Sequence, residues 1–144
     1  MKMGKLFAGI AAPNTKAKLT VNHAQEGHTY TAYRIATFDN PQGDPFDPSK
    51  VTVEIKTVTS PNWVEALRNA FNANKDIPLK DEYQNNPAAA LANLSANHAR
   101  RIIDKLIIPT GATGTELSTS VGGSKTATVD EGWYVVTNTF DGTS

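Results

Sequence analysis

The stretch that most constrains the fold covers residues 27–38 and reads GHTYTAYRIATF. A glycine opens it, and the residues that follow are rich in threonine, tyrosine and isoleucine, with no proline and a single charged side chain. Aromatic and β-branched side chains favour strands that are buried on at least one face. We therefore predict that these residues form a central strand of a β-sheet.

Length and composition limit the class of protein. The chain has 144 residues, 14 basic and 14 acidic side chains, and no cysteine. A chain of this length can bury one hydrophobic core without disulfides or metal ions, so a single domain is predicted. The even charge argues against nucleic acid or an anionic membrane as a partner. The lack of cysteine excludes disulfides, zinc–thiolate sites and thiol catalysis.

The N-terminal residues 1–12 read MKMGKLFAGIAA, two lysines followed by an apolar run. This order is typical of the start of a secretory signal, although Pro13 and Asn14 end the run at the lower limit of its usual length. Two interpretations of residues 1–15 stay open, a flexible tail and a truncated export-signal remnant. No other stretch is long and apolar enough to predict a membrane span. The folded domain is predicted for residues 16–144.

Short strands are expected on either side of the central strand. Residues 16–21 and 50–58 alternate apolar and polar side chains, which is typical of strands with one face in water. Between the central strand and residue 50 the chain reads DNPQGDPFDPS, with three prolines and a glycine. This composition predicts a loop at residues 39–49.

Strand character returns near the C-terminal end. Residues 126–129 and 133–140 flank a turn at residues 130–132, and this arrangement predicts a β-hairpin. Within it, residues 131–136 read EGWYVV and are the expected partner of the central strand. A short edge strand is predicted near residues 116–121.

Two helices are predicted between the early and the late strands. Ser60 and Pro61 fit the cap and the first position of a helix, and Asn86 and Pro87 repeat this start. The first helix has apolar side chains at helical spacing, namely Trp63, Val64, Ala66, Leu67, Ala70 and Phe71. The second is expected to continue as one helix to Pro109. Its apolar stripe consists of Leu91, Leu94, His98, Ile102 and Leu106.

The central strand is expected to be covered on both sides. Tyr30 and Tyr33 are three residues apart, and side chains at that spacing on a strand point to opposite faces. One tyrosine is therefore predicted to face the helices and the other a second sheet. Strands, then helices, then strands predict an α+β fold.

The order of these elements, together with two motifs, resembles the N-terminal D2-type domain (fimbrial isopeptide-formation, immunoglobulin-like) of the sortase-assembled pilins of Gram-positive bacteria. The early family motif G-x-x-Y-x-x-Y-x-I is matched by Gly27, Tyr30, Tyr33 and Ile35. The late motif G-Y-Y-L-V is matched by Gly132, Trp133, Tyr134, Val135 and Val136. The resemblance covers the chain from about residue 16 onward. It implies an α+β, immunoglobulin-like β-sandwich with a two-helix insertion between the early and late strands.

The resemblance also implies a function. It predicts a non-enzymatic structural subunit or domain of a cell-surface pilus (fimbria), located outside the cell on the cell wall and needing no cofactor. The alternative is a monomeric adhesion or ligand-binding module on the same fold, which would contact a host-surface ligand through the loops at residues 39–49 and 110–124.

The sequence departs from the family in ways that bear on its partners. It lacks the V-x-V-Y-P-K segment with the linking lysine and the LPxTG sorting motif. The chain also stops where the family continues into a further strand, so we expect either a fragment or a domain that lacks its final strand. A sheet edge without its last strand exposes unpaired N–H and C=O groups. The expected partners are therefore other pilin subunits or a donated strand from a partner chain.

Members of the family often contain an internal isopeptide bond between lysine and asparagine. This bond needs a desolvated lysine, an amide in contact with it and a buried carboxylic acid. The candidate residues are Lys16, Lys18, Glu54, Asp130, Glu131 and Asn138. The alternative is that these lysines are solvated charges at strand edges.

Other sites have weaker support in the sequence. Asp39, Asp44 and Asp47 fall in the predicted loop and are weak candidates for a calcium site, but their spacing is not that of an EF-hand, and such residues also form turns. The histidines show no metal-ligand spacing, and His98 is expected at the boundary of an apolar helix face. No catalytic residue is predicted.

Overall fold

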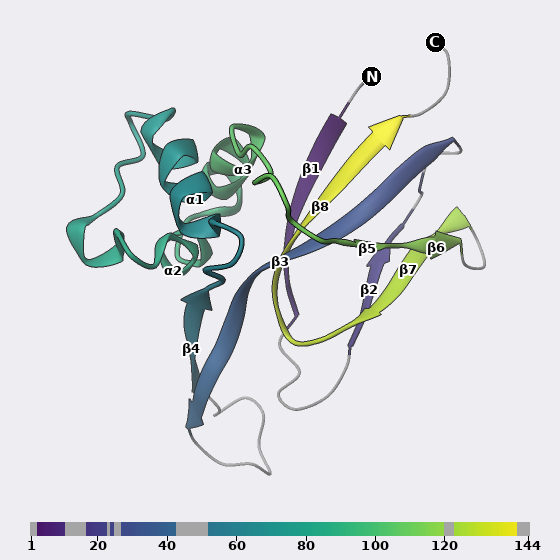
Figure 1. Ribbon diagram of the computed structural model, residues 1–144, viewed down its shortest axis with the longest axis horizontal. Helices are drawn as coiled ribbons and strands as arrows, with labels where there is room; N and C mark the ends of the chain where they lie inside the picture. Colours follow the sequence, from purple (N-terminus) through teal and green to yellow (C-terminus); the bar gives the residue numbers. More distant parts are fainter. Residues whose placement is uncertain are drawn as a thin grey trace.

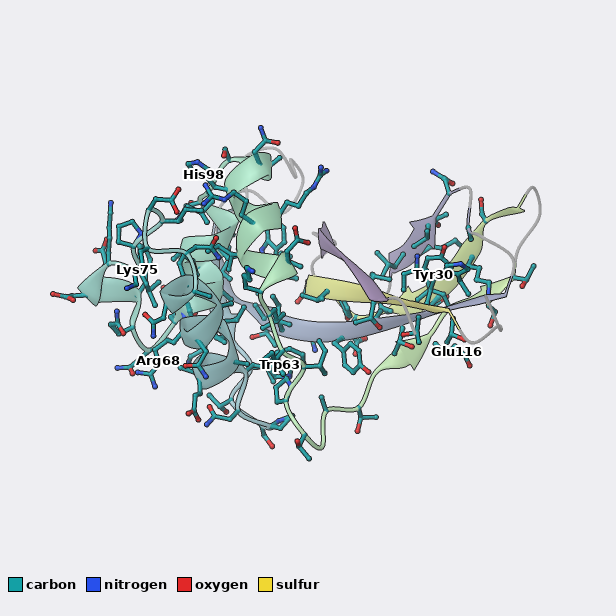
Figure 2. All side chains as sticks on the ribbon, turned by 90° about the horizontal axis from the view of Figure 1, so that it is seen from above. Tyr30, Trp63, Arg68, Lys75, His98 and Glu116 are labelled. Carbon is teal, nitrogen blue, oxygen red and sulfur yellow. The ribbon has the colours of Figure 1, made fainter. Side chains whose placement is uncertain are left out.

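Residues 3–10, 17–22, 24, 27–42, 52–119 and 123–140 are described by the computed structural model shown in Figure 1. The protein is a mixed α+β structure with two antiparallel sheets and several short helices. The helices lie on one side of the larger sheet, and the smaller sheet lies on its other side (Figures 1 and 2). The α+β class predicted from the order of the elements is thus confirmed.

The larger sheet has the strand order β1-β8-β3-β4, and all neighbouring strands in it are antiparallel. These strands are β1 (Met3–Ile10), β8 (Gly132–Phe140), β3 (His28–Gln42) and β4 (Thr52–Thr57). A two-residue strand, β5 (Thr115–Glu116), also pairs with β3. Since β3 pairs with β8, β4 and β5, it is a central strand of the sheet, as predicted.

The smaller sheet has the order β2-β7-β6. It contains β2 (Ala17–Val21), β7 (Lys125–Val129) and β6 (Ser118–Thr119). The predicted first strand and the predicted edge strand near residues 116–121 are therefore present, the latter as the two short pieces β5 and β6.

The helical layer contains α1 (Trp63–Asn72), α2 (Pro87–Ala92), α3 (Ala96–Asp104) and the 3-10 turn η2 (Asp81–Tyr83). Its side chains and one face of the larger sheet form the main core. The fully buried large side chains of this core are Ile35, Leu67, Leu91, Ile102, Ile103, Leu106 and Val135. The opposite face of the larger sheet packs on the smaller sheet through a second cluster. Its buried members are Leu19, Tyr30, Ala32, Leu117, Val129, Tyr134 and Val136.

The two tyrosines of β3 face opposite layers, as predicted. Tyr30 is 4% exposed and belongs to the cluster between the sheets. Tyr33 packs on the helical core, and its ring centroid lies 6.0 Å from that of Trp63. Figure 2 shows Tyr30 and Trp63 on these two sides of the sheet. Strand periodicity of two residues explains the separation.

The second helical segment begins at Pro87 after Asn86, as predicted, but the start of the first helix and the end of the second differ from the prediction. The first helix starts at Trp63, because the Asn62 carboxamide oxygen accepts the backbone N–H of Glu65 at 3.2 Å and caps it. The predicted single helix up to Pro109 is wrong. The chain forms α2 and α3 instead, because the Ser95 hydroxyl caps a new helix by accepting the N–H of His98 at 3.2 Å.

The break between α2 and α3 changes the position of His98. With the helix restarting at Ser95, His98 lies in the first turn of α3 and is exposed. Figure 2 shows it at the outer surface of the helical layer. The prediction that His98 sits on the boundary of an apolar stripe is therefore wrong.

The hairpin predicted around residues 130–132 is also wrong. β7 pairs with β2 and β6, whereas β8 pairs with β1 and β3, so the turn carries the chain from one sheet to the other. Gly132 makes this crossing possible. Its φ of +148° favours glycine, and a Cβ atom there would clash with the carbonyl oxygen of Ala36.

Two further segments differ from the sequence prediction. β3 continues through Gln42, beyond the predicted strand end, with an irregularity in its pairing with β4 between Asp39 and Gln42. Such an irregularity accommodates Pro41, which has no N–H to give to a regular ladder. The rest of the predicted loop, residues 43–49, lies outside the described residues.

Met3–Ile10 form a strand, although the sequence suggests a flexible tail or an export-signal remnant for residues 1–15. The strand pairs with β8 along all eight residues, and this pairing satisfies N–H and C=O groups of β8 that would otherwise be open. The tail interpretation is thus corrected for these residues. Their role in export stays a prediction.

Candidate functional site: the edges of the larger sheet

β8 lies between two strands and has no open edge. On one side Met3 is opposite Thr139 and Ile10 is opposite Gly132, in one continuous register. On the other side β8 pairs with β3, from His28 opposite Phe140 onward. The edge that a missing final strand would leave open is therefore covered by the beginning of the same chain.

β1 occupies a slot between β8 and the helical layer. In Figure 1, α3 lies on the side of β1 that faces away from β8. α3 is also the helix that makes close backbone contacts with β1. β1 is therefore held along its length by the ladder with β8 and is flanked by a helix on its other side.

At the opposite edge of the sheet, a side chain binds the backbone at the end of β4. The Asn86 carboxamide donates to the Ile55 carbonyl oxygen at 2.7 Å and accepts the backbone N–H of Thr57 at 2.9 Å. These are the two bonds that a peptide group of a neighbouring strand would make. The Thr57 hydroxyl donates to the same Asn86 oxygen at 2.7 Å and accepts the N–H of Ala88 at 3.0 Å. Asn86 thus joins the edge of β4 to the start of α2.

The crossing from β7 to β8 is fixed by two side chains from the larger sheet. The Arg34 guanidinium donates to the carbonyl oxygen of Glu131, and the Tyr134 hydroxyl donates to that of Asp130 at 2.6 Å. Burial raises the pKa of the Tyr134 phenol above its ordinary value of 10.0, while nearby Arg34 acts to lower it and Asp130 to raise it. The turn is therefore held by hydrogen bonds to its backbone.

A polar cluster closes the end of the two sheets where β3 and β7 begin. His28 Nδ1 and Asn138 Oδ1 lie 2.5 Å apart, so the imidazole donates to the amide oxygen. The Lys125 ammonium donates to the His28 carbonyl oxygen at 2.9 Å and lies 5.7 Å from the centre of the Tyr30 ring. This ammonium is thus placed by a carbonyl dipole and an aromatic face.

The structure does not bring the described isopeptide candidates into one buried group. Lys18 on β2, Glu54 on β4 and Asp130 are exposed, and β2 and β4 belong to different sheets. Asn138 binds His28. Lys16 lies outside the described residues, and Glu131 is half-buried. The isopeptide bond stays a prediction, since its chemistry needs a desolvated lysine beside a carboxylic acid.

The weak calcium candidates are not brought together either. Asp39 lies on β3, whereas Asp44 and Asp47 lie outside the described residues. Within the described part of the chain, no group of three or more His, Asp or Glu side chains is placed to hold a metal ion. The same part contains no helix that is long and apolar enough to cross a membrane.

The sequence did not allow us to predict all the residues whose side chains bind the ends and edges of the sheets. Asn86 looks like an ordinary helix cap before a proline, yet its side chain makes no capping bond and binds β4 instead. His28 and Lys125 carry no spacing signal, because they are 97 positions apart in the chain. The signature residues Tyr30, Tyr33, Ile35, Trp133 and Tyr134 all lie on the adjacent strands β3 and β8.

Comparisons with protein-family models, curated proteins and solved structures found no match for this chain. The function is therefore proposed from the sequence motifs and the geometry.

Proposed function

We propose that the chain is a structural, non-enzymatic subunit or domain of a cell-surface pilus of a Gram-positive bacterium, with an immunoglobulin-like arrangement of its sheets. The observation that supports this proposal is the pairing of the two motif strands. β3 and β8 are neighbours, with Tyr33 opposite Val135 and Arg34 opposite Tyr134. The two motifs quoted for the pilin resemblance therefore lie on neighbouring, hydrogen-bonded strands.

The way this pair is covered also supports a structural role. Alternate side chains of β3 and β8 enter the core below the helices and the core between the sheets. One side of β8 is covered by β1, and the last residues of β4 are covered by Asn86. The covered backbone groups of β8 and of the end of β4 do not take part in uncontrolled edge-to-edge pairing, which suits a domain that is repeated at high local concentration.

The proposal is tested in the bacterium that makes this chain. Antibodies raised against the purified protein are applied to whole cells for electron microscopy and to cell-wall extracts for immunoblotting under denaturing conditions. A pilus subunit predicts labelled filaments and a ladder of covalent multimers. Labelling confined to the cytoplasm, or surface protein at monomer size without filaments, contradicts the proposal. The second of these results would favour the monomeric adhesion module.

A further inference from the structure

We propose that the slot beside β8 is a strand-binding site that accepts Met3–Ile10 from a second copy of this chain in place of its own β1. The biological role of such a contact rests on the proposed pilus function, whereas the strand exchange itself does not. Its experiment uses the purified protein, so that its failure and the failure of the pilus proposal can be told apart.

The slot recognises a strand through its main chain. Eight consecutive residues of β1 pair with β8 in an unbroken antiparallel register, and α3 lies on the other side. Main-chain ladders of this kind are the basis of strand addition between chains. The same segment of a second copy has the same sequence and can take the same register.

Filling the slot stabilises the fold. Without β1, the N–H and C=O groups on one side of β8 would lose their partners next to Tyr134, Val135 and Val136, which are all buried. Unpaired backbone groups at such a position are costly, so the edge favours any strand that restores the ladder. The backbone ladder is the same whichever copy supplies the strand.

The two segments that cover the sheet edges, β1 and Asn86, differ in whether they can move to another copy of the chain. The end of β4 is bound by Asn86, which is joined on both sides to the folded helical layer and cannot leave alone. β1 is joined to β2 by residues 11–16, and it contacts β8 and α3 in the described fold. Exchange of an identical element between copies through such a connection is domain swapping.

The length of this connection sets the geometry of the exchange. Six residues reach at most about 20 Å when extended, so the two copies must be in close contact. A short link also gives the intramolecular strand an effective concentration of roughly millimolar. We therefore expect the closed monomer in dilute solution and exchange at high protein concentration or in an assembled fibre.

The absence of cysteine permits a direct experiment. Met3→Cys is introduced into a copy with an affinity tag, and Thr139→Cys into an untagged copy, because these two positions are opposite each other in the register. Opposite residues of antiparallel strands have a Cα separation that suits a disulfide. The two proteins are unfolded, mixed, refolded together at low and high concentration, and oxidised.

Exchange predicts a mixed disulfide between the tagged and untagged copies, identified on a non-reducing gel and mapped by mass spectrometry. Its yield should rise with concentration and exceed, by about tenfold, the yield when Thr139→Cys is replaced by Glu116→Cys. Glu116 is an exposed position on β5 and pairs with β3, not with β1. Equal yields in the two mixtures, or no mixed disulfide at all, overturn the proposal.

A matched variant carries both substitutions in one chain. Its internal disulfide, formed before the concentration is raised, holds β1 on its own β8. Light scattering should then show this variant as a monomer at concentrations at which the unmodified chain associates. Association of the locked variant to the same extent as the unmodified chain also overturns the proposal, because it would show that the copies meet through another surface.

Discussion

The Asn86 side chain replaces a peptide group at the edge of β4, and its loss should be costly. We predict that Asn86→Ala lowers the free energy of unfolding by about 2–4 kcal/mol, because the Ile55 carbonyl and the Thr57 N–H lose their partners. Urea unfolding measures this change. The neighbouring exposed Asn85 is the control, and Asn85→Ala should stay within about 0.5 kcal/mol of the unmodified chain. Equal effects of the two substitutions would contradict the assigned role.

The buried phenol of Tyr134 predicts a loss of stability in alkali. Burial raises its pKa above 10.0 in the folded state, so the folded protein holds this proton more tightly than the unfolded chain does. The resulting stability is fully present below about pH 10 and is lost as the pH rises through the folded pKa. Denaturation from pH 8 to 11 should show a smaller alkaline loss in Tyr134→Phe than in the unmodified chain.

The same variant tests the hydrogen bond at the turn. At neutral pH Tyr134→Phe should cost about 1 kcal/mol, since the Asp130 carbonyl loses the Tyr134 hydroxyl. An identical alkaline slope in both proteins would mean that the Tyr134 phenol does not contribute to the pH dependence.

Single residues could be placed from the sequence only where a regular period applied. The opposite directions of Tyr30 and Tyr33 follow from the two-residue period of a strand, and the structure confirms them. The role of Asn86 could not be predicted, because its partner Ile55 is 31 positions away and comes near only when the helices pack on β4.

Gly132 determines how the chain passes from the smaller to the larger sheet. We predict that Gly132→Ala lowers the free energy of unfolding by about 3 kcal/mol or more, because the new Cβ would meet the Ala36 carbonyl oxygen and lie 2.8 Å from Arg34 Nε. Gly111→Ala is the matched control. Gly111 also has a positive φ, of +89°, but an added Cβ there would have no neighbour within 4 Å.

The comparison of the two glycine variants separates the cost of the backbone conformation, which both share, from the steric clash of a Cβ atom, which only Gly132→Ala has. Gly111→Ala should cost only about 1 kcal/mol, the price of the backbone conformation. Chemical denaturation of both variants gives the difference. If Gly132→Ala were no more destabilising than Gly111→Ala, the close approach of Gly132 to β3 would be contradicted.

Elements were predictable from local patterns, whereas their partners were not. Alternating side chains identified β2 and β4, and the Tyr/Thr-rich stretch identified β3. The turn at residues 130–132 also suits a hairpin, because local turn chemistry is the same whether the two strands pair or separate. β8 pairs with β1 and β3, which are both longer than the five-residue β7, and β7 pairs with β2 instead.

At the scale of the whole molecule, the order of the elements predicted the α+β class but not how the sheet is completed. An apolar run after two lysines has the composition of a signal segment as well as that of a strand. Only the long-range register with β8 distinguishes them, and it joins Met3 to Thr139 across nearly the whole chain. The sequence alone could therefore not show that the edge of β8 is closed from within.

The central claim is that β8 is paired on both sides, by β3 and by the N-terminal strand, and amide hydrogen exchange of the native protein tests it most directly. Along a strand, successive N–H groups point to opposite neighbours. Closure by β1 predicts slow exchange for both alternating sets of amides in residues 133–139 of the full chain. Deleting residues 1–10 should then speed up one set only. Fast exchange of every second β8 amide in the full chain, at the rate of exposed loops, would contradict the claim.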